Sequence, residues 1–126
     1  MRAFFQCTFW LPLAGCTWLA LIPDPPDNPV FRLGDVVLHA AAFTYLTVAL
    51  VMARLGARPT PEFPTTAALM IGYGLLLEAI QFFIPERSAE LKDLLVDAAG
   101  IGVGLALARW LALPVYERVL RVSGRL

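Results

Sequence analysis

Four long apolar segments make up most of the chain, and short segments containing proline and charged residues separate them. The separating segments lie at residues 22–34, 59–64 and 85–92, where proline and its polar neighbours end helices. A helix needs about 20 mostly apolar residues to cross the hydrocarbon core of a membrane. The pattern therefore predicts an all-α bundle of four transmembrane helices over residues 3–22, 36–55, 65–84 and 94–113.

The composition agrees with a membrane protein and argues against a soluble domain and a nucleic-acid-binding protein. Of the 126 residues, 59% are hydrophobic and only 16% are charged, with a mean hydropathy of +0.70, whereas a soluble domain carries about 25% charged residues. The ten Lys and Arg residues balance the ten Asp and Glu residues, so the net charge gives no attraction for nucleic acid. We expect one membrane domain over residues 1–126, surrounded by membrane lipids.

The distribution of basic residues predicts the orientation, because Lys and Arg accumulate on the cytoplasmic side of a membrane. With both termini in the cytoplasm, the inner set is the larger one and comprises Arg2, Arg54, Arg58, Arg109, Arg118, Arg121 and Arg125. The outer set is then Arg32, Arg87 and Lys92. After Pro114, apolar residues are mixed with arginines, which suits either a segment lying on the anionic inner leaflet or a frayed basic end.

The first segment also permits a second interpretation. Residues 13–16, Leu-Ala-Gly-Cys, match the cleavage box of bacterial lipoproteins, and cleavage there would leave Cys16 lipidated and remove the first span. The apolar run continues through residues 17–22, which favours an intact helix. Cys7 and Cys16 then lie about 13 Å apart along one helix, too far for a disulfide bond.

Polar side chains occur in pairs on one face of three predicted helices. The pairs are three or four residues apart: Asp35 and His39, Glu78 and Gln81, and Asp93 and Asp97. An ionisable residue at the centre of a span is unfavourable by about 2.5–3.5 kcal/mol and is a functional candidate by default. His39, Gln81 and Asp97 each lie about 6–8 Å below the outer boundary, with Glu78 about one turn deeper. Arg87 lies just above this layer. The matched depths predict a polar pocket that opens at the outer leaflet.

Small and aromatic residues of the spans are assigned to packing. Gly100 and Gly104 are four residues apart and allow another helix to approach closely. Packing within the bundle is favoured over a dimer contact. Tyr45 and Tyr73 are expected to face lipid or its interface with water.

The polar residues together resemble a known family. Asp35-x3-His39, then Glu78-x2-Gln81, Arg87 and Asp93-x3-Asp97-x2-Gly100-x3-Gly104, is similar to the VanZ-like family of small bacterial membrane proteins over about residues 34–113. That family takes its name from a protein that raises resistance to the glycopeptide antibiotic teicoplanin. The resemblance implies a multi-pass protein of the bacterial inner (cytoplasmic) membrane that acts in the cell envelope. The chain departs from the family pattern at Val36, where Lys is common, and at Asp97, where Asn is more usual.

Three functions fit the predicted pocket. In the first, an envelope lipid or glycopeptide-related ligand is bound without turnover by Asp35, Gln81, Arg87, Asp93 and Asp97. In the second, His39 and Glu78 are catalytic residues that act as general acid and base on a lipid-linked phosphate or glycan headgroup. Arg87 and Lys92 would hold the phosphate. In the third, the polar network only fixes the register of the helices.

Other functions agree less well with the sequence. One histidine and no cysteine at ligand spacing do not favour a metal site, although the carboxylates would suit a hard divalent ion better than zinc. No Ser-His-Asp or Cys-His order of a nucleophilic enzyme is present, and no cofactor is expected. A small multidrug exporter would carry an acidic residue in its first span, which here has no charged group.

Overall fold

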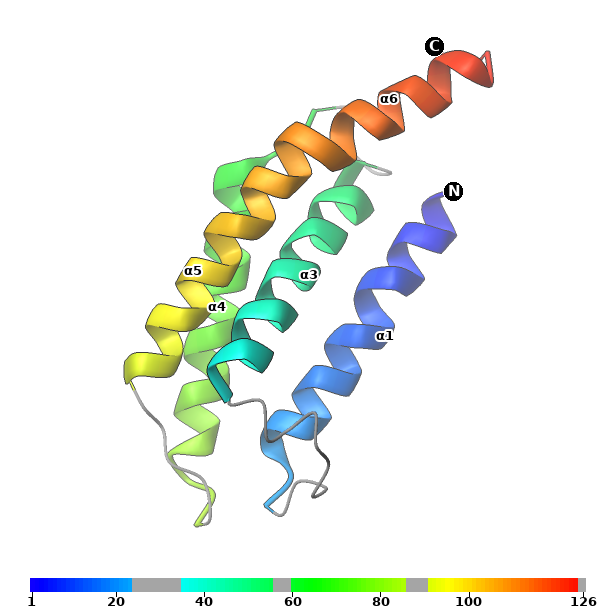
Figure 1. Ribbon diagram of the computed structural model, residues 1–126. Helices are drawn as coiled ribbons and strands as arrows, with labels where there is room; N and C mark the ends of the chain where they lie inside the picture. The colour runs from blue at the N-terminus through cyan, green and yellow to red at the C-terminus, as the bar shows by residue number, and fades with distance from the viewer. Residues whose placement is uncertain (24–34, 56–59, 86–90, 125–126) are drawn as a thin grey trace.

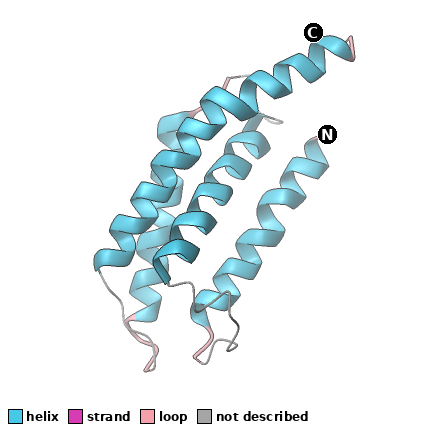
Figure 2. Ribbon diagram, in the orientation of Figure 1, coloured by secondary structure: helices cyan, strands magenta, loops and turns pink. Residues whose placement is uncertain are grey.

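The computed structural model describes residues 1–23, 35–55, 60–85 and 91–124, and within these ranges it contains helices and short turns. Helix α1 covers Arg2–Leu21, α3 covers Asp35–Leu55, α4 covers Phe63–Gln81 and α5 covers Leu91–Leu107 (Figure 1). Four helical segments of the described chain are long and apolar enough to cross a membrane. The regular structure of the described residues is helical (Figure 2), and the protein is therefore an all-α membrane protein.

The fourth helical segment is longer than the sequence predicts. Helical structure continues past residue 113 as a π-helical turn, η1, over Ala108–Ala112 and as α6 over Leu113–Val122. A proline inside a helix removes one hydrogen bond and crowds the carbonyl four residues before it. Here Pro114 lies in the first turn of α6, directly after the wider π turn, in which the N–H of Leu113 donates to the Ala108 carbonyl. The helix therefore passes the proline, and the segment after Pro114 is helical through Val122.

Helix α3 is the central element of the bundle. It contacts α1, α4 and α5, and its contact with α5 is the most extensive. The two termini lie at the same end of the bundle, and α6 extends beyond the other helices at that end (Figure 1). The opposite end contains the start of α3, the end of α4 and the start of α5, and this is the end that carries the predicted site.

The core and the outer surface are both apolar. Buried core residues come from all four spans and include Phe9, Phe43, Leu46, Met70 and Ile101. Large apolar side chains are also exposed on the outside, among them Phe4, Leu11, Leu76, Val103 and Trp110. A surface of this kind is unfavourable in water but suited to lipid. In lipid, close packing and hydrogen bonds between helices hold a bundle together.

Helix α1 is joined to α3 by hydrogen bonds to backbone carbonyls. Pro12 lies inside α1 and has no N–H to donate to the carbonyl of Thr8. The Tyr45 hydroxyl of α3 donates to this carbonyl at 2.8 Å. The side-chain amide of Gln6 donates at 3.0 Å to the carbonyl of Ala53, in the last turn of α3, where carbonyls lack helical partners.

Helix α4 makes a similar contact with α1. The hydroxyls of Thr17 and Tyr73 lie 2.8 Å apart. Tyr73 is half-buried, whereas Tyr45 is 47% exposed. The hydroxyls of both tyrosines thus bond to α1. The exposure of Tyr45 agrees with the expectation that it faces lipid or its interface with water, whereas Tyr73 is partly enclosed by the bundle. For Tyr45, the sequence contained an indication of this bond in Pro12, because a proline within a span leaves a carbonyl that needs another donor.

Candidate functional site

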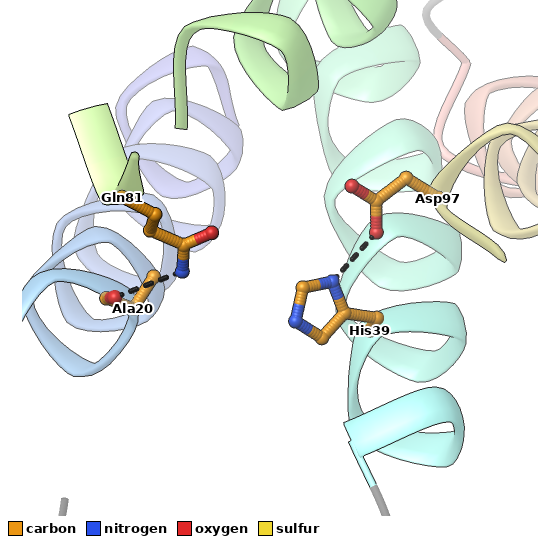
Figure 3. A network of polar contacts seen from close by, with 4 residues as sticks. All are labelled: Ala20, His39, Gln81 and Asp97. Carbon is orange, nitrogen blue, oxygen red and sulfur yellow. Dashed lines mark hydrogen bonds and ion pairs between the residues drawn. The ribbon is translucent and has the colours of Figure 1, made fainter. Parts of the chain in front are cut away.

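A hydrogen bond between His39 and Asp97 joins α3 to α5 inside the bundle. Nδ1 of His39 lies 2.9 Å from Oδ1 of Asp97 (Figure 3). The Asp97 side chain is only 2% exposed, whereas the His39 side chain is 23% exposed. When the Asp97 carboxylate is ionised it can only accept, so in that state the Nδ1–H of His39 donates the hydrogen bond to Oδ1. The contact therefore orients the imidazole and directs Nε2 away from Asp97.

Glycines allow the helices around Asp97 to approach closely. A Cβ added to Gly100 would lie 2.7 Å from the Ala40 carbonyl oxygen, and one added to Gly104 would lie 2.7 Å from the Thr44 carbonyl oxygen. Gly100 and Gly104 thus pack against α3 within the same chain, as the sequence analysis favours. On α4, a Cβ at Gly74 would lie 3.3 Å from Oδ2 of Asp97. The carboxylate is therefore enclosed by α3, α4 and α5.

Glu78 and Asp93 lie one helical turn from the buried carboxylate. Glu78 follows Gly74 by four residues on α4, and Asp93 precedes Asp97 by four residues on α5. At about 1.5 Å per residue, each lies about 6 Å nearer the end of the bundle that is remote from the termini. Glu78 is thus nearer that end than Asp97, which corrects the expectation that it lies about one turn deeper, because Gly74 is the α4 residue that meets Asp97. Both side chains are half-buried. Glu78 and Asp93 are therefore both displaced from Asp97 toward the same end of the bundle.

Gln81 makes a separate contact. It is the last residue of α4 and is buried, and its side-chain amide donates at 3.0 Å to the carbonyl of Ala20 (Figure 3). Ala20 lies in the last turn of α1, where carbonyls have no partner within the helix. Gln81 thus stabilises the end of α1. This bond goes to a backbone group and not to His39 or Asp97.

Two of the predicted site residues fall at the edge of the described chain. Asp35 is the first residue of α3 and precedes His39 by one helical turn, but its side chain lies outside the described part. Arg87 lies wholly outside the described residues. The roles predicted for both residues stay predictions.

The described side chains form no metal-ligand cluster. Within residues 1–23, 35–55, 60–85 and 91–124, no three His, Cys, Asp or Glu side chains are grouped to hold a metal ion. Cys7 is exposed and Cys16 is half-buried, and both are free thiols. Cys16 packs against the core within the continuous helix α1. The described groups of the site are thus one imidazole, three carboxyl groups and one side-chain amide. The imidazole can form hydrogen bonds and can accept or release a proton.

Comparison with known proteins places the chain in a family. The model of the VanZ/LLP1 family matches residues 5–112. The match includes the first span, which the resemblance seen in the sequence did not cover. No curated protein and no solved structure matches the chain. With four candidate spans and a match over most of its length, the chain belongs to the VanZ/LLP1 family of multi-span membrane proteins.

Proposed function

We propose that the polar residues at the end of the bundle remote from the termini form a pocket that binds the headgroup of an envelope lipid or of a glycopeptide-related ligand. The ligand-binding residues of this proposal are Asp35, Gln81, Arg87, Asp93 and Asp97, with His39 and Glu78 beside them. The observation that carries the proposal is the hydrogen bond between His39 and the buried carboxylate of Asp97.

A purely structural role explains this bond poorly. Removing a carboxylate from water is unfavourable, and a buried charged pair is often no more stabilising than well-packed apolar side chains of the same volume. Apolar packing is readily available in this chain, in which the core around Phe43 and Ile101 is already hydrophobic. Keeping Asp97 and His39 together inside an apolar bundle therefore favours a role in recognition or chemistry.

The chemistry of the site favours a ligand rich in hydrogen-bond donors. Asp93, Asp97 and Glu78 accept hydrogen bonds when ionised, and the hydroxyl groups of a glycan headgroup donate them. Lys92 is exposed at the start of α5. It would supply, together with Arg87, a positive charge for a lipid-linked phosphate.

An enzyme is the second candidate function. Asp97 bonded to Nδ1 holds the imidazole in the orientation that a general acid or base requires. In this version His39 and Glu78 exchange protons with a lipid-linked phosphate or glycan headgroup. The third candidate is a structural network, which is favoured by the bond from Gln81 to the Ala20 carbonyl.

Three single substitutions separate function from structure. We expect His39→Ala, Glu78→Gln and Arg87→Ala to abolish the change in teicoplanin susceptibility that expression of the protein confers on a bacterium, while membrane accumulation stays normal. Glu117→Gln, an identical chemical change on the exposed surface of α6, is the matched control and should retain the phenotype. Loss of accumulation in all three site variants, with Glu117→Gln normal, would support the structural network instead.

Lipid analysis distinguishes the binder from the enzyme. Membrane lipids are compared by mass spectrometry in a deletion strain and in the same strain complemented with the native gene or with His39→Ala. Binding predicts unchanged headgroup populations, an altered drug susceptibility and a lipid that co-purifies with the native protein but not with the variant. A headgroup population that changes on deletion and is restored only by the native gene would identify chemistry and refute simple binding.

The orientation is part of the proposal. We infer that both termini lie in the cytoplasm of a bacterium and that the protein resides in the inner membrane. Seven of the ten basic residues lie at the inner ends of the spans, in the terminal segments or around the connection between the second and third spans, when the termini are inside. Single cysteines at Asn28 and Ser88, in a background with Cys7 and Cys16 changed to alanine, should react with an impermeant reagent added outside. A cysteine at Thr60 should not, and its labelling in intact cells would reverse the orientation.

A further inference from the structure

Helix α6, Leu113–Val122, has its side chains sorted by polarity. From Val115 onward, at about 100° per residue, the apolar residues fall within an arc of about 160°, and these are Val115, Tyr116, Val119, Leu120 and Val122. The charged residues Glu117, Arg118 and Arg121 fall within a separate arc of about 100° on the opposite side. The helix is therefore strongly amphipathic, in contrast to the spans, which are mostly apolar around their circumference.

One edge of this apolar arc touches another helix of the described chain. The ring of Tyr116 meets the ring of Phe5 on α1, with centroids 5.8 Å apart. The other edge is exposed: Val115 and Val119 are each 51% exposed, and Val122 is 91% exposed. In the part of the chain that the structure describes, this edge has no buried residue. A hydrophobic edge of this kind needs a partner or an apolar medium.

The position of α6 along the fourth helical segment indicates which medium it meets. The 32 residues of Leu91–Val122 would span about 48 Å, whereas the hydrocarbon core of a bilayer is about 30 Å thick. Residues 91–112 already supply about 33 Å, so α6 begins near the membrane boundary. Figure 1 shows α6 continuing past the bundle at the end where the N-terminus lies. At this end the described basic residues are Arg2, Arg54, Arg109, Arg118 and Arg121.

We propose that α6 lies on the anionic lipid surface of the leaflet next to the two termini. Val115, Val119 and Val122 enter the boundary between headgroups and acyl chains, and Arg118 and Arg121 contact lipid phosphates. An anionic lipid surface fits better than a protein partner because the apolar edge is continuous with a membrane span and is flanked by arginines. This surface lies at the opposite end of the bundle from the proposed ligand site and does not depend on it.

The first test maps the surroundings of α6 in the full chain. Nitroxide labels are attached to single cysteines at successive positions from 115 to 122, in the background with Cys7 and Cys16 changed to alanine. The protein is placed in vesicles of phosphatidylcholine and phosphatidylglycerol. We expect Val115, Val119 and Val122 to be most accessible to oxygen, which concentrates in lipid, and positions 117 and 121 to be most accessible to a water-soluble nickel chelate.

Two other patterns would overturn the proposal. High nickel accessibility at all positions would mean that α6 extends into water. Low accessibility to both reagents at Val115 and Val119 would mean that protein covers the apolar edge, from a second copy or another chain. Trp110, which is exposed just before α6, provides an independent probe.

The second test measures the preference for anionic lipid. In the Trp10→Phe/Trp18→Phe background, Trp110 fluorescence is quenched by brominated phosphatidylglycerol or by brominated phosphatidylcholine, and the ratio gives the preference. Changing Arg118 and Arg121 to glutamine should lower this preference by up to about fivefold per arginine at low salt. Changing both arginines to lysine should preserve the preference for anionic lipid. High salt should weaken this preference in the native protein and in the lysine variant. An unchanged preference in the glutamine variant would refute the role of the arginines.

Discussion

Replacing Gly100 by alanine tests the packing that brings His39 and Asp97 together. A Cβ at this position would lie 2.7 Å from the carbonyl oxygen of Ala40 and 3.1 Å from the Cβ of Phe43. Ordinary contact begins at 3.4 Å, so α3 and α5 must separate by about 0.7 Å. The Ala40 oxygen belongs to the backbone of a helix and cannot rotate away. The whole helix pair must therefore shift.

The shift has two consequences for stability. Overpacking of this kind costs about 1–3 kcal/mol. A separation of about 0.7 Å would also lengthen the contact of His39 with Asp97 from 2.9 Å to about 3.6 Å, beyond hydrogen-bond range. Losing a hydrogen bond to a charged group adds about 1.5–3 kcal/mol. Alanine also stabilises a helix by about 1 kcal/mol relative to glycine. The control must therefore be another glycine-to-alanine substitution in the same helix, so that this contribution is present in both variants.

Gly102→Ala is the matched control, because a Cβ at Gly102 meets no atom within 4 Å on the same helix α5. We expect Gly100→Ala to have a free energy of unfolding at least about 1–3 kcal/mol lower than Gly102→Ala, measured by SDS titration in mixed micelles with circular dichroism. The NMR signal of the His39 Nδ1 proton should also move or broaden in Gly100→Ala only. Equal stability of the two variants would refute the close contact between α3 and α5.

Two further predictions concern single hydrogen bonds. Tyr45→Phe should lower stability by about 1–3 kcal/mol, because it leaves the Thr8 carbonyl without a donor. In a Pro12→Ala background the helix supplies its own N–H, so thermal unfolding should show a much smaller loss for Tyr45→Phe, and an equal loss would contradict this account. Asp97→Asn should leave membrane accumulation unchanged, because the amide oxygen can still accept a hydrogen bond from His39. Loss of the carboxylate should reduce acid–base catalysis at His39, measured as activity on purified lipids, and an unchanged activity would contradict the catalytic role.

Much of the helical architecture could be predicted because it depends on local sequence. The apolar runs and the prolines between them predict the spans, and the observed helices start and end within about three residues of the expected positions except after residue 107. The equal depth of His39 and Asp97 also followed from counting residues along antiparallel helices, and these two side chains are in contact. The continuation through Pro114 could not be predicted, because it depends on the π turn at Ala108, a residue fully buried in the bundle.

The partners of several polar side chains had no signature in the sequence. Gln81 was grouped with the predicted pocket, yet its amide bonds to the carbonyl of Ala20. The side-chain amide of Gln6 likewise bonds to a backbone carbonyl of another helix, that of Ala53. Every residue carries a backbone carbonyl, so the sequence does not distinguish the acceptor. Only the relative placement of two helices identifies which carbonyl at a helix end lies within reach.

The sequence by itself determined that the chain has four helices apolar enough to cross a membrane, where each helix lies along the chain, and that His39 and Asp97 lie at the same depth. These properties follow from residue type and from spacing along one helix. Only the tertiary structure decided that Asp97 pairs with His39 rather than with another group, that glycines of α5 pack against α3, and that α6 continues as an amphipathic helix. These outcomes depend on ångström-scale distances between helices, which result from packing of the whole bundle.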